Sequence, residues 1–424
     1  MNAVSKISAF PPTVQPGLPQ LRILPTGWSR EPIGRHIREV RRPVFMIDTE
    51  VYQLVTAKRA RGGIVPREKL SGREISVKSQ FRIEEGDFLI SKRQIVHGAC
   101  GLVPRELDGA IVSNEYGVLR ARPSMDSRFL SYLSHSIYFQ QTCFHSAIGV
   151  HIEKMIFKLD KWLEREFALP PLPEQKKIAE ILSTWDKAIE TTAKLLANAE
   201  AQKRSLMQQL LTGKRRLKGF ERSEWREVRL RDIARVIVSN VDKKSSSDEL
   251  PVRLCNYTDV YKRDFILPTQ KFMEATATAE QVRKFRLKVD DVIITKDSET
   301  ADDIAMPTYV AETANDLICG YHLAIIRPGK DADGRFLKFI FELPHTRHYF
   351  GTRANGAIRY GLTIDGIERA EIRVPPIEEQ KRIAAVLVAA EETISDHRRE
   401  IRLLKTAKAS LMQQLLTGRR RVTL

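Results

Sequence analysis

The sequence predicts an α+β protein: two globular domains separated by two long helices, which pair as an antiparallel coiled coil and form a pseudo-twofold internal repeat. The chain has 424 residues, which is too long for one compact core and indicates two or three domains. Residues 169–217 and 374–422 align without a gap, with 21 identities in 49 positions. Both copies have the apolar spacing of a helix, and the segments outside them contain strand-like runs.

The internal repeat is the strongest constraint on the fold, because repeated sequence indicates repeated structure. The run LMQQLLTG, from Leu206 to Gly213, recurs letter for letter from Leu411 to Gly418, at an offset of 205 residues. The same offset relates Pro170-Pro171 to Pro375-Pro376, and Glu174-Gln175-Lys176 to Glu379-Gln380-Lys381. Each copy therefore begins at a Pro-Pro pair and ends at a Thr-Gly pair.

Each copy has the signals of one long helix. Pro173 or Glu378 follows the Pro-Pro pair, and an acidic first turn suits the helix dipole. Gly213 and Gly418 stand where a helix C-terminus favours a left-handed residue. A 4-3 spacing defines five heptads in each copy, over about 38 residues or roughly 57 Å. The apolar residues of this seam are Ile178, Leu182, Trp185, Ile189, Leu196, Leu206, Leu210, Ile383, Leu387, Ile394, Ile401, Leu404, Leu411 and Leu415.

Lys203 and Lys408 occupy the same seam position in the two copies and decide the direction of pairing. Parallel helices in register would bury the two ammonium groups against each other, which is unfavourable. Antiparallel pairing separates them by roughly 30 Å of helical rise. We therefore predict antiparallel helices. These lysines either set the pairing register or extend to the edge of the helix pair, and both interpretations stay open.

The two segments outside the helices also resemble each other, though faintly. The run from Asp87 to Lys92 (DFLISK) aligns with the run from Asp291 to Lys296 (DVIITK), and both read as strands with turn residues nearby. These runs predict mixed α/β or mostly β domains. The expected parts are a flexible N-terminal arm (1–24), a first globular domain (25–168), a first helical segment (169–217), a second globular domain (218–373) and a second helical segment (374–424).

These motifs resemble the specificity subunits of type I restriction–modification systems. The resemblance is carried by the Pro-Pro-x-x-Glu-Gln-Lys starts at 170–176 and 375–381, by the two LMQQLLTG ends, and by the alternation of domain and helix. It implies a non-catalytic subunit whose two target-recognition domains each read half of a split DNA sequence. It also implies two methyltransferase subunits docked on the helices, together with restriction subunits. AdoMet, ATP and Mg²⁺ would belong to those partners. The role of the N-terminal arm is left open.

The charge of the chain supports a polyanionic partner for one half of it. The formal net charge is +17, and such basic chains commonly bind nucleic acids. Residues 1–173 contain 25 basic and 17 acidic residues, whereas residues 218–378 contain 26 of each. Charge therefore supports DNA binding by the first domain and says nothing about the second.

Basic and amide side chains on loops are the expected DNA contacts, because phosphate contacts position a protein and base edges give specificity. Lys92 and Lys296 are favoured because both copies keep this position. The Gly62-Gly63 pair beside Arg61 is equally compatible with a plain hairpin turn. The candidates are Arg41, Arg42, Lys58, Arg59, Arg61, Lys92, Arg93, Lys243, Lys244, Arg283, Lys284, Lys296, Arg353, Arg359 and Tyr360, the last three from the run RANGAIRY. The basic residues after each helix, KRR and RRR, are C-terminal helix charges, DNA phosphate contacts or both.

Catalytic motifs are absent from the sequence. There is no Asn/Asp-Pro-Pro-aromatic motif, no glycine-rich AdoMet turn and no GxxxxGK[ST] loop. Asp87 with Lys92, or Asp291 with Lys296, could suggest a metal nuclease, but a turn residue at the strand edge is the favoured interpretation. His345 and His348 lack a third ligand at suitable spacing, so we expect surface histidines and no metal site.

Four widely spaced cysteines form no CxxC pair, which argues against a disulfide framework and for the cytoplasm. The main competing interpretation is a coiled-coil scaffold whose globular domains bind proteins, which the neutral second domain would suit. A stand-alone nuclease is the least favoured.

Overall fold

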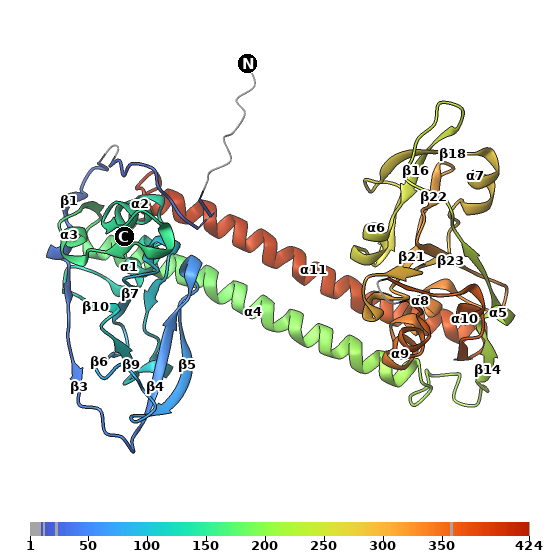
Figure 1. The fold of residues 1–424 in the computed structure, drawn as a ribbon, viewed down its shortest axis with the longest axis horizontal. Helices are drawn as coiled ribbons and strands as arrows, with labels where there is room; N and C mark the ends of the chain where they lie inside the picture. Colours follow the sequence, from blue (N-terminus) through green and yellow to red (C-terminus); the bar gives the residue numbers. More distant parts are fainter. Residues whose placement is uncertain (1–9, 12, 22–23, 357–358, 424) are drawn as a thin grey trace. The chain divides into compact units, whose positions relative to one another are not determined.

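A computed structural model describes residues 10–11, 13–21, 24–356 and 359–423 (Figure 1). The chain forms two compact units: Met1–Thr192 with Glu400–Leu424, and Ala193–Arg399. Both long helices contribute to both units: α4 spans Leu172–Leu210 and α11 spans Ile377–Leu416. The first unit therefore contains the start of α4 and the end of α11, and the second contains the end of α4 and the start of α11.

The first unit contains two main sheets with helices beside them. The four-stranded sheet has the order β2 (Ile37–Glu39), β10 (Tyr116–Ala121), β7 (Phe88–Ser91) and β8 (Cys100–Leu102). The five-stranded sheet has the order β3 (Pro43–Val44), β6 (Gln80–Arg82), β9 (Ile111–Ser113), β4 (Val51–Ala57) and β5 (Ile64–Ser71). Smaller pairs join β1 (Ser29–Pro32) to β13 (Glu166–Leu169) and β11 (Ala147–Ile148) to β12 (Ile156–Phe157). The helices are α1 (Ser127–Leu133), α2 (Ile137–His145) and α3 (Leu159–Leu163).

The second unit repeats this plan with different additions. Its five-stranded sheet has the order β15 (Ala234–Val238), β23 (Leu323–Pro328), β19 (Val292–Thr295), β21 (Pro307–Val310) and β17 (Phe265–Ile266). A three-stranded sheet contains β18 (Met273–Ala277), β16 (Leu250–Cys255) and β22 (Leu317–Cys319). Two pairs join β14 (Arg226–Arg229) to β25 (Glu371–Val374) and β20 (Asp297–Ser298) to β24 (Tyr360–Gly361). The helices are α5 (Leu230–Ile233), α6 (Tyr257–Lys262), α7 (Ala279–Phe285), α8 (Gly334–Glu342), α9 (Pro344–Arg353) and α10 (Ile364–Glu368).

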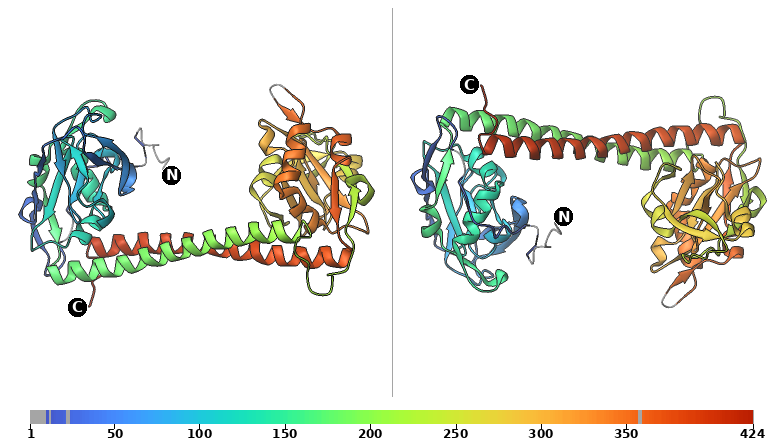
Figure 2. Two further views of the ribbon diagram at one scale, coloured as in Figure 1. Left: turned by 90° about the horizontal axis from the view of Figure 1, so that it is seen from below. Right: turned by 90° about the horizontal axis from the view of Figure 1, so that it is seen from above.

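The predicted antiparallel pairing of the helices is confirmed within each unit (Figure 2). In the first unit, Ile178 and Leu182 near the start of α4 share a buried core with Leu415 and Leu416 at the end of α11. In the second unit, residues at the end of α4 share a core with residues at the start of α11. Its members include Met207, Leu210, Ile383 and Leu387. Start meets end in both units, so the helices run in opposite directions.

The residues placed in the seam by sequence are all buried or half-buried in the structure. Trp185 is half-buried. Each seam lysine pairs with an acid on the other helix: Lys203 Nζ lies 2.5 Å from Glu391 and Lys408 Nζ lies 2.5 Å from Asp186. The two lysines thus avoid each other, as the antiparallel argument requires.

The central strands of the two units are equivalent. In the first unit, β7 lies between β10 and β8; in the second, β19 lies between β23 and β21, with antiparallel pairing on both sides. Phe88 pairs with Leu119, and Val292 with Ile326. The faint sequence similarity therefore reflects a shared sheet.

The repeated glutamate at each helix start is buried and binds an arginine that follows the other helix. Glu174 accepts hydrogen bonds from Arg421 Nε and Nη2, both at 2.8 Å. Glu379 accepts from Arg216 Nε at 2.9 Å and Nη2 at 2.7 Å. Both glutamates are at most 3% exposed. The last arginine of each basic run, KRR and RRR, is therefore held by a buried carboxylate.

The repeated glutamine has an equally fixed role. Gln175 Nε2 donates to the carbonyls of Ser124 and Pro170, while its Oε1 accepts from the Asp126 amide. Gln380 makes the same three bonds to the backbone of residues 331, 375 and 333. The Glu-Gln pair therefore anchors each helix start to its globular domain.

The described part of the predicted N-terminal arm lies against α2. Val14 is 3% exposed, and the Phe10 ring meets the Phe144 ring edge-on at 5.9 Å. His145 Nε2 lies 3.1 Å from the Pro16 carbonyl. The expected flexibility of residues 1–24 falls partly on residues that the structure does not describe. These are residues 1–9, 12 and 22–23.

Among the described residues, no helix has the length and apolar character needed to cross a membrane.

We predict that Glu379→Ala lowers the free energy of unfolding by about 3 kcal/mol, because it leaves the Arg216 guanidinium without its buried partner. Urea unfolding followed by tryptophan fluorescence measures the change. The control is Glu378→Ala, whose side chain is 68% exposed and whose loss should change stability by less than about 0.5 kcal/mol. Equal effects of the two substitutions would contradict the role given to Glu379.

Candidate nucleic-acid interface

In the first unit, five of the predicted basic residues gather where the central strand ends. Lys92 follows β7 and donates from Nζ to the Asn114 carbonyl at 3.0 Å. Arg93 is exposed and pairs with Glu115 at 2.5 Å. The turn between β4 and β5, residues 58–63, reaches the same place because Arg59 Nε donates to Gln94 Oε1 at 2.8 Å.

The β4–β5 connection is a hairpin turn, as the Gly62-Gly63 pair allowed. Ala60 and Arg61 have φ of 56° and 57°, and Gly63 has φ of 82°. Left-handed φ is unfavourable for residues with a Cβ atom, so this turn is held by its surroundings. The Arg61 amide donates to the Gly98 carbonyl at 2.8 Å, which fixes the hairpin against the residues that follow β7.

Arg61 itself points inward. Burial lowers the pKa of its guanidinium, and its buried Nη1 has no hydrogen-bond partner in the part of the chain that the structure describes. Lys58, by contrast, is exposed. The outward basic groups of this turn are therefore Lys58 and Arg59, the latter also paired with Glu153 at 2.7 Å.

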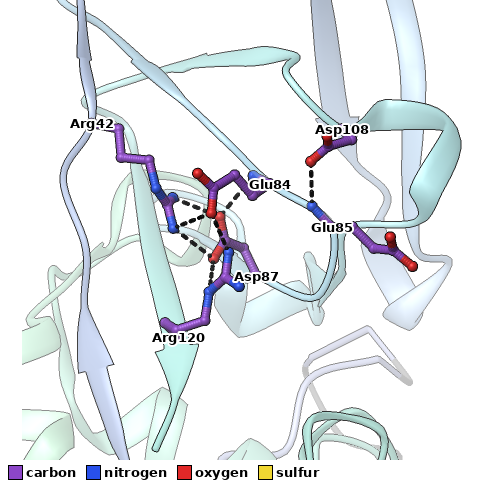
Figure 3. A network of polar contacts seen from close by, with 6 residues as sticks. All are labelled: Arg42, Glu84, Glu85, Asp87, Asp108 and Arg120. Carbon is purple, nitrogen blue, oxygen red and sulfur yellow. Dashed lines mark hydrogen bonds and ion pairs between the residues drawn. The ribbon is translucent and has the colours of Figure 1, made fainter.

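Arg42, one of the other two candidates of the first domain, lies in a separate ion-pair network with Arg120, Glu84 and Asp87 (Figure 3). Arg42 Nη1 donates to Asp87 at 2.8 Å, and Arg42 Nη2 lies 2.9 Å from Glu84. Arg120 binds the same two carboxylates. Arg42 is thus occupied by acidic partners, while Arg41 remains exposed beside Glu39.

Asp87 and Asp291 are buried acceptors of arginine, a role that the sequence did not reveal. Asp87 is 0% exposed and Asp291 is 1% exposed. Asp291 accepts from both Nε and Nη2 of Arg327, each at 2.7 Å. Their oxygens also accept backbone amides, from Glu84 and Lys288 respectively. These carboxylates therefore hold arginines and turns in place, which explains why the aspartate is repeated.

In the second unit, the equivalent place after β19 has different side chains. Lys296 Nζ donates to Asp297 at 2.6 Å, and His322 Nδ1 lies 2.8 Å from the other oxygen of Asp297. The pairing of β20 with β24 brings Tyr360 opposite Ser298. Arg359 is exposed. Lys296, Arg359 and Tyr360 are thus brought together by the sheet.

Arg353 lies at the end of α9, with its guanidinium 3.7 Å from the centroid of the Tyr349 ring. Residues 357–358 of the run RANGAIRY lie outside the described residues. Asn355 pairs with Gly361 through two backbone hydrogen bonds, at 3.0 and 2.9 Å, so the described ends of this run form a narrow loop.

Sequence reasoning missed the polar and aromatic neighbours of Lys296. His322 has a left-handed φ of 72°, and its ring lies 3.9 Å from that of Tyr321. Tyr257 and Tyr261 stack at 5.8 Å, and the Tyr257 hydroxyl lies 3.1 Å from Ser298 Oγ. The signal for Tyr321 and His322 was available in the sequence, because residues 116–123 and 321–328 are related by the same offset of 205 and both runs begin with tyrosine and end with proline. No signal marked the two tyrosines of α6.

The remaining candidates form a second group in this unit. Lys243 and Lys244 are exposed in the loop before β16, and Arg283 and Lys284 are exposed on α7. The Ser246 amide bonds to Thr276, and Gln281 bonds to Asn240 at 3.4 Å. These contacts hold the loop near α7, and the Tyr321 amide donates to the Val241 carbonyl at 2.7 Å, which joins the start of the loop to the residues around Lys296.

Among the described residues, the groups around Lys92, Lys296 and Lys243 do not have the ligand set of a metal centre. His345 and His348 are exposed on α9. Among the described residues, the one cluster of three potential ligands is Asp264, Glu342 and Glu391. Both of its glutamates bind lysine ammonium groups. The residues around Lys92 in the first unit and around Lys296 in the second provide cations, amides, hydroxyls and aromatic rings. This mixture suits recognition of phosphates and base edges.

The two units share a scaffold but differ in the polar residues that they expose, which is typical of a recognition protein. Comparison with known proteins identifies the class of recognition protein. The chain matches the family model described as type I restriction modification DNA specificity domain over residues 47–201 and again over residues 222–406. The chain therefore belongs to this family, and its class is the non-catalytic specificity subunit.

Relatives agree with this membership. The type I restriction enzyme MjaVIII specificity subunit of Methanocaldococcus jannaschii is 25% identical over 423 residues, covering 94% of each chain. The MjaX specificity subunit of the same organism is 28% identical over 270 residues, which span 60% of this chain and 59% of that relative.

Solved structures show the same fold. The type I restriction–modification system S subunit from M. genitalium has a TM-score of 0.58 at 14% identity, covering 94% of this chain and 99% of that one. A chain from a structural study of type I R-M complex assembly has a TM-score of 0.55 at 18% identity, covering 93% and 99%.

We predict that Asp297 stabilises the second unit at neutral pH and loses this effect in acid. Burial favours the protonated form of Asp297, but its bonds to Lys296 and His322 outweigh burial and lower its pKa. A lowered pKa contributes stability above the unfolded value near about 4, and this is lost as pH falls below it. Asp297→Asn should therefore reduce the thermal midpoint at pH 7 and reduce the midpoint in acid progressively less as pH falls through the lowered pKa of Asp297. Glu299→Gln, an exposed neighbour, should change neither value. A pH-independent loss in Asp297→Asn would refute the ionic origin.

Proposed function

We propose that this chain is the DNA-recognition subunit of a type I restriction–modification complex, in which each globular domain reads one half of a bipartite asymmetric site. The observation that carries the proposal is that equivalent positions in the two units are surrounded by different side chains. Lys92 and Lys296 follow equivalent central strands, yet the residues near Lys92 are arginines paired with glutamates and an amide, whereas Lys296 binds an aspartate that also contacts a histidine. A shared scaffold with different recognition residues suits two different half-sites.

In this proposal, exposed cations contact phosphates and the polar residues beside them contact base edges. Lys58, Arg59 and Arg93 would serve the first domain, and Arg353, Arg359 and Tyr360 the second. Lys243, Lys244, Arg283 and Lys284 would extend the phosphate contacts of the second domain. The second domain carries no net charge, so its binding would depend on where these side chains lie.

The helices would fix the spacing between the half-sites and dock the methyltransferase subunits. Their repeated sequence provides two similar surfaces, which suits two copies of one partner. Restriction subunits would join the same complex, and AdoMet, ATP and Mg²⁺ would be bound by the partners. Support comes from the names of the relatives, which are specificity subunits of type I restriction enzymes. Action on cellular DNA would place the chain in the cytoplasm.

The proposal predicts a split motif with a fixed spacer in a selection from a random duplex library, using the chain co-expressed with its methyltransferase subunit. Gln94→Ala, which changes a polar residue beside Arg59, should alter recovery of one half of the motif, and Tyr360→Ala, beside Arg359, should alter the other half. Recovery of no motif at low salt would overturn the proposal and favour a protein-binding scaffold.

A second prediction concerns salt. Each phosphate contact contributes about −0.9 to the slope of log K against log salt concentration. Removing Lys58, Lys243 or Arg283 by substitution with alanine should each reduce the slope by about 1 if the residue contacts a phosphate. Fluorescence anisotropy at several salt concentrations measures this slope. Lys187→Ala, at an exposed position of α4, provides the control, and equal slopes in all variants would refute the assigned contacts.

A further inference from the structure

The ion pair in the helix seam is present twice, and the internal repeat relates its members. Adding the offset of 205 to Asp186 and Lys203 gives Glu391 and Lys408, so each pair has one lysine and one acid at matching positions. Lys203 Nζ lies 2.5 Å from Glu391 Oε1 in the second unit, and Lys408 Nζ lies 2.5 Å from Asp186 Oδ1 in the first. Both pairs join α4 to α11.

In the second unit, α8 of the globular domain adds two more charges to this pair. Lys338 Nζ binds Glu391 Oε1 and lies 2.6 Å from Glu342 Oε1. Glu342 Oε2 lies 3.0 Å from Lys203. The result is a closed ring of two lysines and two glutamates from three helices, which we call the four-residue cluster: Lys203, Lys338, Glu342 and Glu391.

In the first unit, α1 occupies the corresponding place but contributes a tyrosine. The Tyr132 hydroxyl donates to Asp186 Oδ2 at 2.7 Å, and Lys408 Nζ lies 5.3 Å from the centroid of its ring. Burial, with the neighbouring Asp186, raises the pKa of Tyr132 to about 12, so the hydroxyl remains a donor. This contact contains one ion pair and one hydrogen bond from an uncharged hydroxyl to the same carboxylate.

The seam lysines Lys203 and Lys408 are similarly exposed, at 16% and 18%, but the groups that bind them differ in burial. The side chain of Lys338 is 1% exposed and that of Glu391 is 5% exposed. In the first unit, the side chain of Asp186 is 48% exposed. Moving α8 away from the helix pair would leave buried charges without partners, which is strongly unfavourable. Moving α1 would separate polar groups that water can reach and solvate, at a smaller electrostatic cost. Both α1 and α8 also share a buried apolar core with the helix pair, so the difference between the two attachments is electrostatic.

Within the cluster, the pKa shifts of Glu342 and Lys203 favour their charged forms, whereas that of Glu391 favours its protonated form. Burial favours neutral Glu342, yet Lys338 and Lys203 outweigh burial and lower its pKa. Burial likewise opposes the charge on Lys203, but Glu342 and Glu391 raise its pKa. Glu391 Oε2 is buried without a hydrogen-bond partner among the described residues, and burial raises the pKa of Glu391. The cluster therefore depends on all its members being held at close distance.

We propose that the four-residue cluster is a rigid latch that fixes the second recognition domain on its helix pair, whereas the Tyr132–Asp186–Lys408 contact holds the first domain less tightly. This inference rests on the proposed function for its consequence: the latch would set the spacing at which the second domain meets its half-site. The latch itself is a property of the folded chain and needs no DNA.

The test measures distances within each unit by electron-spin resonance on pairs of introduced labels. The four native cysteines are buried, so cysteines placed at exposed positions can be labelled selectively. Lys284→Cys on α7 with Glu392→Cys on α11 reports on the second unit. Lys69→Cys on β5 with Lys187→Cys on α4 reports on the first. All four positions are exposed.

In the full chain, we expect a narrow distance distribution in the second unit and a broader one in the first. Lys338→Met removes the central charge of the latch at similar length and should broaden the second distribution by about twofold. Lys330→Met, at an exposed lysine of the same domain, should leave it unchanged. If Lys338→Met does not fold, Glu342→Gln, which keeps the volume and removes one charge, replaces it with the same expectation.

An unchanged, narrow distribution in a folded latch variant would overturn the inference. The consequence for DNA is tested separately, by repeating the library selection with Lys338→Met and the methyltransferase subunit. Recovery of both half-sites with more than one spacer length supports the role of the latch in spacing. Recovery with the parental spacer alone refutes that role, whereas absence of any motif in the parent chain refutes the proposed function instead.

Discussion

The architecture depends on two buried glutamate–arginine pairs that connect the ends of the long helices. Glu174 at the start of α4 binds Arg421 beyond the end of α11, and Glu379 at the start of α11 binds Arg216 beyond the end of α4. Each carboxylate is desolvated, so it requires its arginine, and the arginine can reach it only if the helices run in opposite directions. The same residues therefore explain the repeated motifs at both ends of each helix and the direction of pairing.

Beyond these helix ends, the charged residues fall into two sets: some are buried and stabilise the fold, and others are exposed to solvent. Asp87 and Asp291 hold arginines inside the two sheets, and Gln175 and Gln380 join each helix start to backbone groups of its domain. These groups are satisfied within the fold and leave nothing to offer a partner. The exposed cations and aromatic residues lie on turns and helix surfaces, where substitutions affect the scaffold little. This arrangement allows recognition residues to differ between two units that share one framework.

The repeat is symmetric in sequence along the helices but not in how the globular domains contact them. The same seam position carries a lysine in both copies, yet one is enclosed by a second lysine and two glutamates and the other by a tyrosine and an aspartate. The difference between α1 and α8 therefore changes how strongly each globular domain is attached to the helix pair, while α4 and α11 keep the same seam residues.

The sequence by itself determined the helices, their length and their direction, because heptad spacing and helix-end residues act over a few neighbouring positions. It also located the central strands, since DFLISK and DVIITK are local apolar runs. The tertiary structure alone decided which charges are structural. Nothing near Arg42 or Arg421 in the chain indicates an acidic partner, because Asp87 lies 45 residues from Arg42 and Glu174 lies 247 from Arg421. The same holds for the cluster at Lys338, 53 residues from Glu391. Ion pairing depends on distance in space and on exclusion of water, and both are set only when the chain has folded.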